Sequence, residues 1–170
     1  MQIIKSSIDM SLLIGELVDI FRPEANIKKV DISTEIPNGL FIKADRNLMR
    51  ELFNNLISNA IKFSKKSGGE VKIMAKIIED DIAQFKVCDE GIGIALEDLP
   101  HIFERFYQPK VEIPGREKGL GMGLAFVNQI ITAHGGMIKA ESKMGKGTEI
   151  TFTLPEASLK KEDRREAITL

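Results

Sequence analysis

Two asparagines and a lysine share one face of a predicted helix, and together they could bind a metal ion and phosphate. Asn55, Asn59 and Lys62 follow Glu51 at spacings of four, four and three residues, which puts their side chains on one helical stripe. A polar stripe is ordinarily a solvated surface, but such surfaces mostly use lysine, glutamate and arginine. Asparagine is a poor helix former that carries a neutral oxygen acceptor and an amide donor. These side chains could therefore coordinate Mg²⁺ and contact phosphate oxygens.

A carboxylate stands at the end of a predicted strand. Residues 85–89 alternate so that Asp89 shares a face with Phe85 and Val87, toward the expected core. A carboxylate there needs a hydrogen-bond donor. A simple strand-end turn is the alternative, since aspartate followed by glycine is common in turns. Gly91 and Gly93 would allow a sharp turn and a close approach of the backbone to a ligand.

A glycine-rich segment precedes the last predicted helix. Gly119, Gly121 and Gly123 lead directly into an apolar helical run, so that backbone N–H groups would converge at a helix N-terminus and attract phosphate. The spacing fits neither the mononucleotide loop nor the Gly-x-Gly-x-x-Gly dinucleotide fingerprint, and the Ser/Thr kinase signatures are missing. A different nucleotide-binding fold is therefore required.

Helices and strands predicted from the apolar periodicity place these residues around one core. The predicted helices cover residues 11–23, 45–63 and 124–134, with Ser11 and Asp45 capping the first two. The predicted strands cover residues 30–34, 40–42, 70–78, 82–89, 137–142 and 148–154, and each of the first two pairs forms a hairpin. This pattern indicates an α+β fold, a two-layer α/β sandwich whose helices cover one face of a mixed, mostly antiparallel sheet. Residues 1–155 form this domain, and residues 156–170 form a charged tail.

Composition narrows the classes of partner. A chain of 170 residues with 43% hydrophobic residues is long enough for one domain with a real core. The net charge of −1 gives no basic footprint, so nucleic acid is not an expected partner. Cys88 is the only cysteine, which suits a reducing, cytoplasmic location. No stretch has the roughly 18 apolar residues that cross a bilayer, and no export signal opens the chain, so this fragment is expected to be soluble and to make no membrane contact.

Five segments, in order, resemble the motifs of the histidine-kinase ATP-binding domain. This family belongs to the Bergerat-type ATPases, with gyrase, chaperone and mismatch-repair relatives. Residues 51–63 resemble its N box, 89–94 the first glycine box, 103–107 the F box, 119–124 the second glycine box and 145–148 the final glycine-threonine element. Each segment alone is a weak signal, whereas five in the family's order make a strong one.

The resemblance implies a role for each matched residue. Asp89 would accept a hydrogen bond from the amino group of adenine, Phe63 would pack near the base, and Asn59 would hold Mg²⁺. Asn55 and Lys62 would reach the phosphates of ATP. The remaining nucleotide-binding positions carried over from the family are Gly91, Gly93, Ile94, Tyr107, Gly119, Leu120, Gly121, Gly123, Leu124 and Thr148.

Residues 108–118 form a long loop that we expect to be a mobile lid over the nucleotide, because loops of this length are uncommon unless functional or disordered. Arg105 and Lys118 flank it as cations that could neutralise charge on the transferred phosphoryl group. Solvated loop charges are the alternative for both. Tyr107 could simply pack the base of the lid.

The reaction implied by the resemblance is that of a protein-histidine kinase. The domain would donate the γ-phosphoryl group of ATP to a histidine, with Asn55, Lys62 and Arg105 as catalytic residues. Neither His101 nor His134 looks like the acceptor, which in the family belongs to a dimerisation and phosphotransfer helical hairpin expected before Met1. A response regulator would receive the group next, and the parent protein could be membrane-anchored.

Two other functions compete with phosphoryl transfer. ATP-hydrolysing relatives resemble one another in carrying a glutamate one helical turn before the metal-binding asparagine, to activate water. That position here is Asn55, which cannot act as a general base, so transfer is favoured over hydrolysis. A non-catalytic nucleotide-binding module would be expected to have damaged motifs, whereas Asn59, Asp89 and the glycines are all present.

Overall fold

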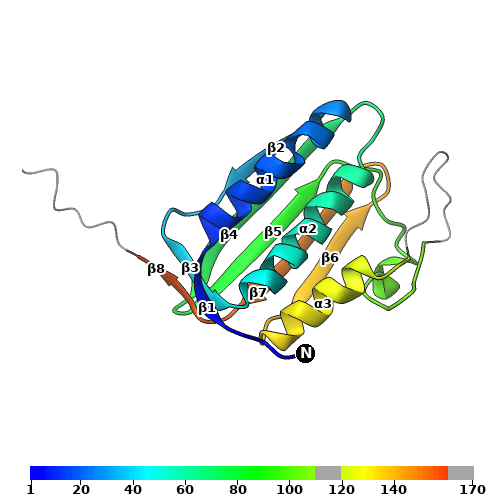
Figure 1. Cartoon of the computed structure of the whole chain (residues 1–170). Coiled ribbons are helices and arrows are strands. Elements are labelled where there is room, and N and C mark those ends of the chain that lie inside the picture. The colour runs from blue at the N-terminus through cyan, green and yellow to red at the C-terminus, as the bar shows by residue number, and fades with distance from the viewer. Residues whose placement is uncertain (110–119, 161–170) are drawn as a thin grey trace, which may run out of the picture.

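Three helices lie side by side against one face of a sheet, and a smaller sheet closes one end (Figure 1). The structure is a computed structural model, and it describes residues 1–109 and 120–160. In chain order the elements of these residues are β1 (Ser6–Asp9), α1 (Met10–Ile27), β2 (Val30–Glu35), β3 (Leu40–Ala44), α2 (Arg46–Lys62), β4 (Gly69–Glu79), β5 (Ile82–Asp89), the 3-10 helix η1 (Leu99–His101), α3 (Gly123–Ala133), β6 (Ile138–Lys143), β7 (Gly147–Leu154) and β8 (Ala157–Leu159).

The predicted α+β sandwich with a mixed, mostly antiparallel sheet is confirmed. The larger sheet has the order β2-β4-β5-β7-β6, and within it only β2 and β4 run parallel. The smaller sheet has the order β1-β3-β8 and is antiparallel. In the described ranges, no helix is both long and apolar enough to cross a bilayer.

The predicted hairpin between residues 30–34 and 40–42 is wrong. β2 pairs with β4, with Val30 opposite Gly69, while β3 pairs with β1 and β8 in the smaller sheet. The turn at residues 37–39 does reverse the chain, since the N–H of Leu40 donates to the carbonyl of Pro37. A turn signal shows that the chain bends, but the partner of each strand is set by packing elsewhere in the fold.

The predicted start of the first helix and the predicted end of the domain also change. Asp9, not Ser11, caps α1, because its side chain lies where β1 ends and accepts the N–H of Leu12 at 3.1 Å. The fold also continues past the predicted boundary at residue 155, because β8 adds to the edge of β3 and buries Ala157. Residues 161–170 of the predicted tail lie outside the described part of the chain.

The middle helix, α2, forms as predicted and carries the core. Asp45 caps it by accepting the N–H groups of Asn47 and Leu48, and it ends at the cap Phe63. Its buried face presents Phe53 to the sheet, where the rings of Phe53, Phe85 and Phe152 lie with centroids 5.2 to 5.8 Å apart. Such ring pairs add stability beyond the area they bury.

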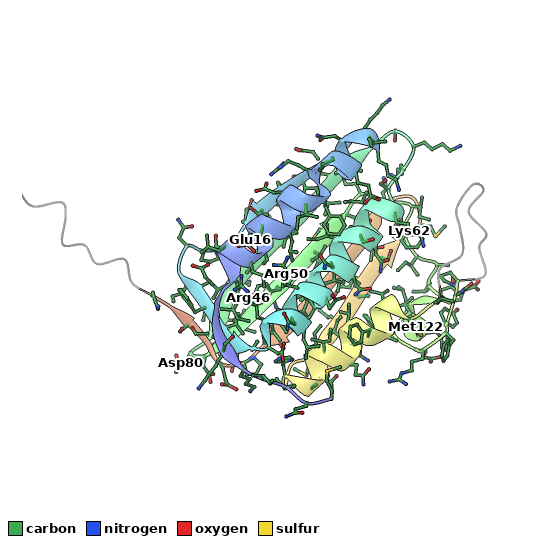
Figure 2. All side chains as sticks on the ribbon, in the orientation of Figure 1. Glu16, Arg46, Arg50, Lys62, Asp80 and Met122 are labelled. Carbon is green, nitrogen blue, oxygen red and sulfur yellow. The ribbon has the colours of Figure 1, made fainter. Side chains whose placement is uncertain are left out.

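The helices α2 and α3 run antiparallel, which gives the molecule two distinct ends. The C-terminus of α2 and the N-terminus of α3 lie at one end, marked by Lys62 and Met122 in Figure 2, and we call it the site end. At the opposite end, the far end, His134 joins the two helices. Its Nδ1–H donates to the carbonyl of Ile130 at 2.8 Å, and its Nε2 accepts the N–H of Asp45 at 3.1 Å. This buried imidazole is therefore a structural link with both nitrogens in use.

Candidate functional site

The core-facing positions of three neighbouring strands change from apolar to polar at the site end. β5, β7 and β6 pair in register, so that opposite residues form rows across the sheet. Two rows are apolar, and the next row along is polar: Phe85–Phe152–Ile138, Val87–Ile150–Ala140 and then Asp89–Thr148–Ser142. Opposite residues share a face, so the polar row faces the helices as the apolar rows do. The predicted inward direction of Asp89 is confirmed.

Asp89 is a half-buried carboxylate held in place by the backbone around it. Its Oδ1 accepts the N–H of Gly91 at 2.9 Å. Burial raises the pKa of Asp89 above its usual value, and hydrogen bonds from the backbone of Gly91 and Thr148 oppose that rise. The predicted strand-end turn is thus present as well, and it fixes the Oδ1 atom of the carboxylate.

Gly91 brings the first glycine box against the end of α2. A Cβ at this position would lie 2.4 Å from the carbonyl oxygen of Phe63 and 2.7 Å from Asp89 Oδ1, so only glycine fits. The carbonyl of Phe63 also accepts the N–H of Ile92 at 3.0 Å. Phe63 and Asp89, predicted near the base of a nucleotide, therefore meet in space. The Lys62 ammonium lies 5.4 Å from the centroid of the Phe63 ring.

The asparagines of α2 meet the start of α3. A Cβ on Gly123 would lie 2.8 Å from Asn55 Oδ1 and 3.9 Å from Asn59 Nδ2. The amide nitrogen of Asn55 donates to the carbonyl of Glu51 at 2.8 Å, which turns its oxygen toward α3. The predicted N box and second glycine box are thus brought together, with amide groups facing the N-terminus of a helix.

The first glycine box continues toward β6. Gly93 packs against the carbonyl of Lys143, and the N–H of Ile94 donates to Ser142 Oγ at 2.8 Å. Ser142 Oγ also lies 2.8 Å from Thr148 Oγ1. Thr148 and Ile94, both predicted to contact the nucleotide, are therefore joined through one side chain that the sequence motifs did not single out.

The F box packs on the second glycine box. The N–H of Phe106 donates to the carbonyl of Gly121 at 3.0 Å. Tyr107 donates its hydroxyl to the buried Asp98, and this bond raises the pKa of Tyr107 to about 12. The packing role considered for Tyr107 agrees with this contact. Arg105 donates to Gln129 Oε1 of α3 at 3.2 Å.

Part of the predicted site lies outside the described residues. Lys118, Gly119 and most of the predicted lid belong to residues 110–119, which the structure does not describe. Leu120 is exposed beside this segment, and Leu124 packs partly buried against the core.

Sequence reasoning missed two polar residues that organise the site, Ser142 and Asp98. Asp98 is buried beneath Tyr107, and Ser142 sits between two predicted motifs. The alternation of inward and outward residues along β6 could have identified Ser142, because it puts Ser142 on the same inward face as Ala140 and Ile138.

Comparison with known proteins agrees with this arrangement. Residues 44–158 match the family of histidine kinase-, DNA gyrase B- and HSP90-like ATPases. The chain belongs to this ATPase family. The matched range contains all five motifs, which confirms the resemblance found in the sequence and makes the domain an ATP-binding one.

The ATPase domain is similar to those of named sensor kinases. Sensor histidine kinase WalK of Bacillus subtilis is 39% identical over 140 residues, covering 81% of this chain and 23% of that protein. Sensor-like histidine kinase SenX3 of Mycolicibacterium smegmatis is 32% identical over 166 residues, covering 94% of this chain and 43% of that protein. The chain spans less than half the length of either relative.

Solved structures share the same histidine kinase ATPase fold. Full-length ShkA in complex with AMPPNP superposes with a TM-score of 0.80 at 27% identity, over 95% of this chain and 33% of that one. The nucleotide-free catalytic domain of histidine kinase ThkA gives a TM-score of 0.77 at 26% identity, over 92% of this chain and 99% of that one.

Proposed function

We propose that this domain is the catalytic domain of a two-component sensor histidine kinase, and that it donates the γ-phosphoryl group of ATP to a histidine on a separate dimerisation domain. One observation supports this proposal most. One end of an ATPase-family fold carries both the Asp89 carboxylate and the α2 asparagines, which face the N-terminus of α3.

At the base, Asp89 is suited to accept a hydrogen bond from an amino group. Its Oδ1 is occupied by the Gly91 N–H, and the neighbouring Thr148 supplies a second oxygen in the same row. We assign Phe63 to the base because its backbone carbonyl, bonded to the Ile92 N–H, lies against Gly91 at the end of this row. Gly93, Ile94 and Leu124 would line the same site.

At the phosphates, we assign Asn59 to Mg²⁺ and Asn55 and Lys62 to phosphate contacts. Amide oxygens suit a hard cation that keeps several waters and takes its other oxygens from phosphate. In the described ranges, no group of three or more His, Cys, Asp or Glu could hold a metal ion. When bound, Mg²⁺ would neutralise charge on the phosphoryl group. Arg105, Lys118 and the Gly119 to Gly123 backbone would add to that.

Transfer to a protein side chain is favoured over hydrolysis. Asn55, one turn before Asn59, cannot take a proton from water. The domain's own histidines are poor acceptors, because both nitrogens of His134 are bonded within the core and His101 Nδ1 contacts Glu104 at 2.9 Å. The acceptor we propose is the helical hairpin of the parent kinase, with a response regulator downstream.

Two measurements test this function. Calorimetry should show ATP binding that strengthens with Mg²⁺. The domain should then transfer the labelled γ-phosphoryl group of ATP to a histidine-bearing dimerisation segment supplied in trans, giving a label that is lost in acid and kept in base. Release of inorganic phosphate at the same rate with and without that segment would instead support an ATP-hydrolysing relative.

A further inference from the structure

The hydroxyl of Ser142 joins three parts of the site. Its oxygen accepts the backbone N–H of Ile94 at 2.8 Å, and it lies 2.8 Å from the carbonyl oxygen of Gly147 and 2.8 Å from Thr148 Oγ1. Ser142 and Thr148 are direct cross-strand partners, and Thr148 is in turn opposite Asp89. The three side chains therefore form one polar row on the face that carries the base site.

Counting donors and acceptors assigns the protons in this cluster. A carbonyl oxygen only accepts, so the Ser142 proton must point to Gly147. The two lone pairs of Ser142 then accept the Ile94 N–H and the hydroxyl proton of Thr148. Every hydrogen-bonding capacity of Ser142 is thus used. The proton of Thr148 is used as well, which leaves its oxygen with only lone pairs to offer a ligand.

We propose that Ser142 is a positioning residue for base recognition, which makes Thr148 a pure hydrogen-bond acceptor beside Asp89 by taking its proton. This inference rests on the proposed function, in which Asp89 faces the amino group of adenine. Two adjacent acceptors favour a base edge that donates hydrogen bonds. They disfavour a carbonyl oxygen at the same place, because two acceptors would then face each other.

ATP and purine riboside triphosphate provide the matched pair of ligands, since they differ only in the amino group at C6 and both keep N1 as an acceptor. Affinity for both should be measured by calorimetry with Mg²⁺ for the parent chain, Ser142→Ala, Thr148→Val and the double variant. In Ser142→Ala the Thr148 proton is free to turn toward the ligand, so the preference for ATP over purine riboside triphosphate should fall about fivefold. In the Thr148→Val background, Ser142→Ala should change that preference less than about 1.5-fold, because no hydroxyl remains to be oriented.

Ser33→Ala is the matched control, since Ser33 also lies on a strand of the large sheet but bonds to Glu70. It should leave the preference unchanged. If Ser142→Ala does not fold, Ser142→Cys supplies a weaker acceptor and should lower the preference about twofold. The inference is overturned if Ser142→Ala weakens both ligands equally, or if it lowers the preference equally with and without the Thr148 hydroxyl. Failure of the proposed function would look different, because the parent chain would then bind no ATP or Asp89→Asn would not weaken binding.

Discussion

The two ends of the α2 and α3 pair use polar side chains in opposite ways. At the far end, His134 bonds from one helix to the cap of the other, so the hydrogen bonds cross between elements. At the site end, the Asn55 amide bonds to its own helix, and the Asp89 carboxylate accepts hydrogen bonds from the backbone of Gly91 and Thr148, so these bonds do not run from α2 to α3. The His134 bonds connect the two helices, whereas the bonds of Asn55 and Asp89 fix the directions of side chains that we assign to the ligand. Changes at the far end should therefore affect stability, and changes at the site end should affect ligand binding.

The largest effect should come from Asp89→Asn. An asparagine that keeps the Gly91 bond through its oxygen turns its amide donors toward the amino group of adenine, so ATP affinity should fall at least about 100-fold. The free energy of unfolding should not fall, because the change removes a charge whose burial is unfavourable. Calorimetry and urea unfolding measure the two quantities.

Asp80→Asn is the control for this variant. Asp80 lies in the turn of the same β4–β5 hairpin, at its other end (Figure 2). Its substitution should leave ATP affinity unchanged. ATP affinity of Asp89→Asn within about threefold of the parent would remove Asp89 from the base site.

His134→Ala should show the reverse behaviour at the far end. The change leaves the N–H of Asp45 and the carbonyl of Ile130 without their partner, and should cost about 2 to 3 kcal/mol of the free energy of unfolding. ATP affinity of the folded fraction should stay close to that of the parent. His101→Ala, at an exposed histidine, should cost less than about 0.5 kcal/mol in the same urea titration. A large loss of ATP affinity in His134→Ala would contradict the separation of the two ends.

Asn59→Ala should distinguish the metal from the base. Binding of ATP with Mg²⁺ should weaken about tenfold, whereas binding in the presence of a chelator should weaken less than about twofold, because the lost group is a metal ligand. Asn47→Ala, near the far end of the same helix, is the matched control. Equal losses with and without Mg²⁺ would argue against the metal assignment.

The smallest effect should be a pH dependence that belongs to Asp89 alone. Because its pKa is raised in the folded state, its contribution to stability is more favourable when it is protonated and becomes unfavourable as pH rises through that pKa. Relative to Asp89→Asn, the parent chain should therefore gain stability as pH falls from neutrality through the raised pKa toward the ordinary range of an aspartate carboxyl. Urea unfolding of both proteins across this range measures the difference, and parallel curves would count against the buried carboxylate.

Local signals predicted much of this molecule. The cap and periodicity of α2, the β4–β5 hairpin and the inward direction of Asp89 all depend on residues close together in the chain. The pairing of β2 with β4 and the addition of β8 to β3 were not predicted, because strand partners far apart in sequence leave no local pattern. The role of Ser142 was not predicted for the same reason, because it depends on hydrogen bonds with Ile94 and Thr148, which only the folded sheet brings close to Ser142.

The polar row also limits how the length of this sequence can change. Asp89, Thr148 and Ser142 face the same way because three strands keep one register. Inserting a single residue into β7 before Ile150 could slip that register and turn Glu149 toward Asp89, so that two carboxylates would meet where an acceptor and a ligand belong. A substitution, by contrast, alters one contact at a time. An insertion of two residues restores the alternation of inward and outward side chains along β7. An insertion scan of β7 should therefore alternate between loss and partial retention of ATP binding with each added residue.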